Sequence, residues 1–92
     1  MYIVGASNLD NQRRIDITGL FEHKPEKVTL VIEPENREFV RVLLGPQNFG
    51  ENRKVERGSR LIIPNWIVKL YPNTNRVLLF TDGNDKHYLK FE

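Results

Sequence analysis

The chain has 92 residues, enough for one small domain, and a domain of this size has a thin core. It contains no cysteine, which excludes disulfide bonds and thiolate metal sites and favours a reducing, intracellular setting, either cytoplasmic or nuclear. No stretch approaches the ~20 apolar residues of a membrane helix, and the N-terminus lacks the basic region of a signal peptide, so we expect no membrane partner and no signal peptide.

The net charge of +2 is too small to indicate a nucleic-acid partner by itself, but the charges are unevenly distributed. Residues 37–60 carry six basic and three acidic side chains, and five of those six basic residues are arginines. Arginine binds phosphates through a planar fork and stacks on bases, which lysine does not. This arginine-rich middle indicates either an ordinary solvated surface or a phosphate-binding one.

The first third of the chain predicts one clear strand. Residues 2–4 form either a short edge strand or a tail pinned to the body, and residues 5–12 are loop-like, so residues 1–12 would be a loosely held N-terminal segment. Residues 13–18 alternate polar and apolar, which predicts a strand with one solvated face. Gly19 then interrupts the pattern, as expected at a bulge or a sharp bend.

The middle of the chain predicts a hairpin. Residues 27–32 form an alternating apolar strand, and the turn residues 33–36 lead into a second strand over residues 37–44. One face of this second strand is purely aliphatic, and the other carries two arginines around a phenylalanine. Residues 45–56 contain two glycines and a proline, so we expect a long loop there, with at most one turn of helix.

Residues 61–71 form the longest apolar run, and we expect a strand with a bulge or an edge position at Pro64, which cannot donate to a ladder. Alternation along this strand would turn Trp66, Val68 and Leu70 inward and Ile67, Lys69 and Tyr71 outward.

The C-terminal part predicts a second hairpin. Strands are expected over residues 77–81 and 86–92, joined by the turn at residues 82–85. Six short strands separated by turn signals, without an amphipathic helix, predict one all-β domain over residues 1–92. We expect a small barrel of five to six strands, because closure hides strand edges that a tiny sheet cannot cover. A sandwich or an Sm-like topology stays open as an alternative.

The ribbon from Val55 to Asp82 carries a family resemblance. It consists of the lead-in Val55-Glu56-Arg57-Gly58-Ser59, the apolar residues 61–63, the stretch 66–71, a short turn and the strand 77–81. This order resembles the oligonucleotide/oligosaccharide-binding (OB) fold, in particular the simple single-stranded DNA-binding proteins of archaea and eukaryotes. The resemblance implies an OB-like barrel with base-stacking aromatics at Tyr71 and Phe80. Ile67 stands where that family has a third aromatic.

Binding of single strands needs cations for the phosphates and exposed aromatic faces for the bases. We expect the site on neighbouring strands of the barrel, at residues of the outward rows: Arg37, Phe39, Arg41, Lys69, Tyr71 and Phe80. The sequence therefore favours binding of single-stranded DNA or RNA with little sequence specificity.

Two other functions remain open at this point. The domain could be an OB-fold protein-interaction subunit in a replication, repair or telomere-type complex, with outward apolar residues Leu43, Ile67 and Leu78 as its interface. It could also be a viral or structural β-domain.

The sequence contains no pattern that indicates catalysis. His23 and His87 lie in different elements without further metal ligands at a supporting spacing. No nucleophile stands beside a base, and no glycine-rich phosphate loop is present. We therefore expect neither an enzyme nor a bound metal or cofactor.

Overall fold

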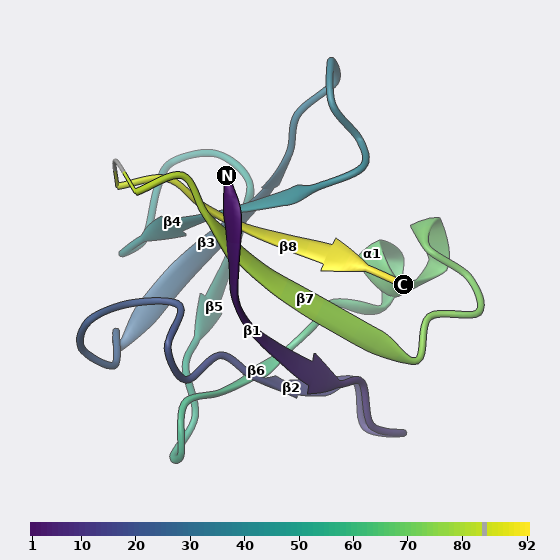
Figure 1. The fold of residues 1–92 in the computed structure, drawn as a ribbon, viewed down its shortest axis with the longest axis horizontal. Helices are drawn as coiled ribbons and strands as arrows, with labels where there is room; N and C mark the ends of the chain where they lie inside the picture. The colour runs from purple at the N-terminus through teal and green to yellow at the C-terminus, as the bar shows by residue number, and fades with distance from the viewer. Residues whose placement is uncertain (84) are drawn as a thin grey trace.

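The computed structural model describes every residue of the chain except Asn84, and the described residues form eight strands and one short helix (Figure 1). The elements are β1 (Tyr2–Asn8), β2 (Arg14–Asp16), β3 (Lys27–Ile32), β4 (Val40–Leu44), β5 (Glu51–Lys54), β6 (Arg60–Ile62), α1 (Asn65–Leu70), β7 (Arg76–Thr81) and β8 (His87–Phe91). No helix in this part of the chain has the length and apolar character needed to cross a membrane.

The strands form one large and one small antiparallel sheet. The large sheet has the order β1-β7-β8-β4-β3-β5, and the small sheet pairs β2 with β6. The small sheet lies between the two edges of the large one, with β2 beside β1 and β6 beside β5. Within the described residues no backbone ladder joins these neighbours, and Asp16 N–H donates instead to the Ser7 hydroxyl at 2.8 Å. The all-β prediction is confirmed, whereas the predicted closed barrel is not formed and the large sheet is open.

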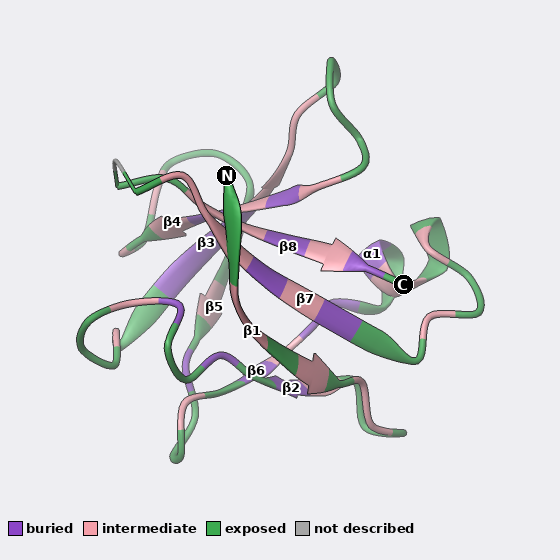
Figure 2. Ribbon diagram, viewed as in Figure 1, coloured by how far each residue is buried: buried purple, intermediate pink, exposed green. Residues whose placement is uncertain are grey.

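The core follows from the alternation along the strands of the large sheet. Cross-strand pairing places Leu79 opposite Leu89, Leu89 opposite Val40, and Val40 opposite Ile32, so one apolar row crosses four strands. The small sheet adds buried Ile15 and Leu61 from the other side. Figure 2 shows these buried positions along β7 and β8, and it shows the N-terminal half of β1 as exposed.

The predicted strand over residues 61–71 is wrong, because only β6 is extended and α1 follows it. Pro64 caps the helix, and its carbonyl accepts hydrogen bonds from the N–H groups of Ile67 and Val68 at 3.0 and 3.1 Å. A helix repeats every 3.6 residues rather than every two. The predicted inward and outward rows are therefore wrong at three positions, because Ile67 is fully buried while Trp66 and Leu70 are exposed. Val68 packs against the core and Lys69 is exposed, as predicted.

Two predicted loops contain strands. Residues 5–8 belong to β1, which pairs with β7, and β5 lies within the predicted loop at residues 45–56. Both segments consist of small or polar residues, and they are strands because a neighbouring strand offers them backbone hydrogen bonds. The local sequence pattern does not reveal such pairing.

The predicted strands at residues 27–32, 77–81 and 86–92 are confirmed as β3, β7 and β8. Those at residues 13–18 and 37–44 are confirmed as the shorter strands β2 and β4. The predicted hairpin between β7 and β8 is confirmed by their pairing, although Asn84 of its turn lies outside the described residues.

Candidate binding groove

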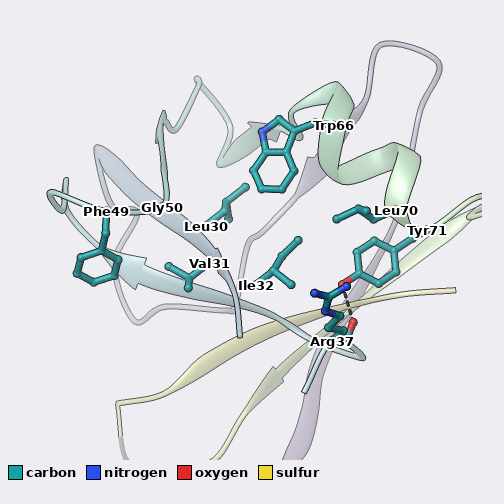
Figure 3. A pocket seen from close by; sticks show the side chains of 9 residues that line it. All are labelled: Leu30, Val31, Ile32, Arg37, Phe49, Gly50, Trp66, Leu70 and Tyr71. Atoms are coloured by element: carbon teal, nitrogen blue, oxygen red, sulfur yellow. Dashed lines mark hydrogen bonds between the residues drawn. The ribbon is translucent and has the colours of Figure 1, made fainter. Parts of the chain in front are cut away.

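An open groove of about 760 Å³ lies between α1 and the C-terminal half of β3. This volume is in the range that proteins use for small ligands and short segments. Its lining is mainly apolar, and Figure 3 shows the residues of α1 facing those of β3 across it. The residues that line it are Leu30, Val31, Ile32, Arg37, Phe49, Gly50, Trp66, Leu70 and Tyr71.

Three large apolar side chains around the groove are unusually exposed. Phe49, Trp66 and Leu70 retain 51%, 48% and 53% of their accessible surface. Trp66 and Leu70 are four residues apart, so they lie on the same side of α1, and the burial of Ile67 in the core orients the helix in this way. The indole N–H of Trp66 donates to Glu51 Oε1 at 2.7 Å, which holds the ring in place.

Tyr71 lines one end of the groove and is held in place by two contacts. Its ring stacks on Phe91 with centroids 5.0 Å apart and planes inclined by 12°, and its hydroxyl donates to the carbonyl oxygen of Arg37 at 2.6 Å (Figure 3). Burial raises the pKa of the Tyr71 hydroxyl above its usual value, and the nearby charge of Arg37 opposes this shift. Tyr71 therefore joins the segment before β4 to the end of α1 as a neutral phenol.

Arg37 is the cation of the groove. It is exposed, and it forms no ion pair with any residue that the structure describes. Arg41 differs, because its guanidinium lies 3.4 Å from Glu33 Oε1. The Tyr71 end of the groove therefore carries a positive charge without a partner in the described part of the chain.

Gly50 shapes the opposite end of the groove. Its φ of +74° lies in the left-handed region, and a Cβ at this position would stand 2.8 Å from the carbonyl oxygen of Leu30. Only glycine allows the chain to approach β3 so closely and then turn away from it. Phe49, which precedes Gly50 in the chain, remains exposed.

The structure places five of the six predicted site residues on two separate surfaces and Lys69 on neither. Arg37 and Tyr71 meet at the groove. Phe39, Arg41 and Phe80 belong instead to the outer face of the large sheet, and Lys69 is exposed in the last turn of α1 outside the lining of the groove. The predicted single face is thus not formed.

The outer face of the large sheet carries an aromatic cluster. The ring of Phe39 makes edge contacts with Phe80 at 5.4 Å and with Tyr88 at 5.9 Å between centroids. Lys90 Nζ lies 5.9 Å from the centroid of the Phe39 ring and 2.9 Å from Glu38 Oε1. Three cations of this face, Arg41, Lys90 and Arg76, are therefore each paired with a glutamate.

Sequence reasoning missed the main lining of the groove, namely Phe49, Trp66 and Leu70. The signal that could have found the last two is the spacing of four residues after Pro64, which is typical of a helix face. Phe49 offered no comparable signal, since it follows no periodic pattern.

Comparisons with protein-family models, with curated proteins and with solved structures find no match to this chain. The resemblance to OB-fold single-stranded DNA-binding proteins therefore stays a prediction. Within the described residues, no group of three or more histidines, aspartates or glutamates is arranged to hold a metal ion.

Proposed function

We propose that this chain is a protein-interaction domain that binds an apolar segment of a partner protein in the groove between α1 and β3. The observation that carries this proposal is the half-exposure of Phe49, Trp66 and Leu70 around one depression. Full burial of one such side chain stabilises a complex by roughly 1.5–3 kcal/mol. Exposed apolar groups gathered at one place are typical of interaction sites.

The charges around the groove favour a protein segment over a nucleic acid. A single-stranded nucleic acid needs cations along its whole backbone. The groove offers one cation in its lining, Arg37. A segment of a partner protein with mainly apolar side chains suits this lining better than a chain of phosphates.

The experiment that tests this function is a selection from a library of displayed peptides, with the chain as the immobilised target. We expect peptides rich in apolar residues, whose binding changes the fluorescence of Trp66, the single tryptophan. Leu70→Asp places a charge in the groove and weakens their binding at least roughly tenfold. Lys69→Asp is the matched control, because Lys69 is an exposed neighbour on α1 outside the groove. Circular dichroism checks that both variants fold.

Two results contradict the proposal. One is a selection that enriches no peptide above background. The other is a set of peptides that bind wild type and Leu70→Asp with the same affinity, because such peptides occupy another surface.

A second candidate is the binding of single-stranded DNA or RNA on the outer face of the large sheet. The observation that favours it is the cluster of Phe39, Phe80 and Tyr88 with Lys90 at its rim. Stacking of a base on an aromatic ring stabilises binding by roughly 1–3 kcal/mol. This candidate implies an OB-like domain, although the open sheet lends that architecture no support.

Fluorescence anisotropy of labelled oligo-dT and oligo-U tests this second candidate at about 50 and 200 mM salt. If this candidate is right, oligonucleotide binding should weaken steeply as the salt concentration rises. The substitution Phe80→Ala should weaken binding further at either salt concentration. Tyr71→Ala is the variant that separates the two surfaces, because Tyr71 belongs to the groove. An oligonucleotide affinity that is the same for wild type and folded Phe80→Ala contradicts stacking on this face.

A further inference from the structure

We propose that the groove binds its partner by strand addition. An extended segment of the partner pairs with the free edge of β3 at Ile32, and an acidic side chain near its N-terminal end meets Arg37. This inference rests on the proposed protein-interaction function and specifies the conformation and the charge of the bound segment.

The edge of β3 is only partly covered. β4 pairs with β3 as far as Ile32, which lies opposite Val40. On the other side β5 pairs with β3 only as far as Leu30, which lies opposite Glu51. The last two residues of β3 therefore have a neighbouring strand on one side only, and the groove occupies the other side.

The backbone of Ile32 points toward the groove. Val55 N–H donates to the Glu26 carbonyl on the β5 side, and Gly45 N–H donates to the Lys27 carbonyl on the β4 side. In an antiparallel ladder consecutive residues direct their backbone groups to opposite sides. The backbone N–H and C=O groups of the even-numbered residues of β3 therefore point to the β5 side. The ladder with β5 extends only as far as Leu30, so it does not reach Ile32. No described residue supplies a hydrogen-bond partner for the N–H or C=O of Ile32.

Gly50 explains why this edge is open. If β5 continued in the same register, Phe49 would lie opposite Ile32. The left-handed turn at Gly50 ends the ladder instead and directs Phe49 outward. The free N–H and C=O of Ile32 therefore form a ready template for another strand.

The surroundings of this edge specify the chemistry of the added strand. Trp66 and Leu70 on α1 face the edge across the groove, so every second side chain of the guest meets an apolar wall (Figure 3). An antiparallel guest continues the direction of β5, and its N-terminal end lies where β3 ends, next to Arg37. Charge complementarity to Arg37 then calls for a carboxylate at that end of the guest.

The test uses the peptide acetyl-Glu-Val-Thr-Val-Leu-Val-Thr-amide and two isomers of it, N-methylated at the third or at the fourth residue. Alternate N–H groups of a paired strand point to its neighbour, so we expect one isomer to lose at least roughly fivefold in affinity and the other to bind like the parent. Binding should also slow the hydrogen exchange of the Ile32 amide, while the Val31 amide, which faces β4, keeps its rate.

The acidic contact has its own control. Replacing the peptide's glutamate with glutamine should weaken binding to wild type several-fold but leave binding to Arg37→Ala unchanged. Arg57→Ala, an exposed arginine outside the lining of the groove, should behave as wild type.

The outcomes separate this inference from the function on which it rests. In one outcome, the selected peptides depend on Leu70 but both N-methylated isomers bind with the same affinity. The groove then binds a helix or another conformation, which overturns strand addition but not the interaction function. The same holds if selected peptides bind and the test peptide does not at about 1 mM. A groove that binds no peptide overturns both proposals.

Discussion

Gly50→Ala is the substitution that best tests how the groove is built. The new Cβ would stand 2.8 Å from the carbonyl oxygen of Leu30, 2.8 Å from Thr29 Cγ2 and 3.0 Å from Val31 Cγ2. Gly45→Ala is the matched control, because Gly45 has a φ of +71° and a Cβ there would meet no described atom within 4 Å beyond its chain neighbours. The two substitutions thus share the backbone strain and differ in the crowding.

The expected losses follow from these contacts. A left-handed conformation costs a residue with a Cβ roughly 1–2 kcal/mol, and this cost applies to both variants. Overpacking adds about 1–3 kcal/mol at Gly50 only. Any gain from a less flexible unfolded chain is shared, so the difference between the two variants isolates the crowding against β3.

Chemical denaturation at equilibrium measures both free energies of unfolding. We expect Gly45→Ala to lose about 1–2 kcal/mol and Gly50→Ala about 2–5 kcal/mol, as the sum of the two costs. Equal losses would refute the close approach of Gly50 to β3. In that case crowding at Gly50 could not explain why the β3–β5 ladder stops at Leu30 and leaves the edge of Ile32 free.

Two further predictions concern the burial of single side chains. Ile67→Ala should lower the free energy of unfolding by about 2–5 kcal/mol, whereas Leu70→Ala should change it by no more than about 0.5 kcal/mol. A larger loss for Leu70→Ala would contradict the helix α1 and favour a strand there. Burial lowers the pKa of His87, whose ring lies 4.2 Å from that of Phe21, and two neighbouring aspartates oppose this shift. Because the unfolded chain then binds the proton more readily, denaturation midpoints should fall as the pH drops below the ordinary histidine value of 6.5, and His87→Gln should flatten that slope.

Strands that bury one full face were predictable from the sequence. In β7 the buried Val77 and Leu79 alternate with half-buried neighbours, and β8 repeats the pattern with Leu89 and Phe91. The period of two arises directly from the geometry of a strand over a core. β5 could not be found in this way, since it contains only polar residues and exists because β3 offers it a ladder.

The candidate site was predictable only in part. Arg37 and Tyr71 do meet, but through the hydroxyl of Tyr71 and the carbonyl of Arg37 rather than as neighbours on paired strands. The alternation of a strand would place Trp66 and Leu70 in the core. The helical period after Pro64 exposes them and buries Ile67 instead.

The sequence by itself determined that the chain is mainly β, because alternation and turn residues are local properties of the chain. Only the tertiary structure decided where ladders end and which faces stay uncovered. The turn at Gly50 stops β5 before Ile32, and the burial of Ile67 rotates α1 so that Trp66 and Leu70 face that free edge. Both effects depend on contacts between segments far apart in the chain, and together they form the groove.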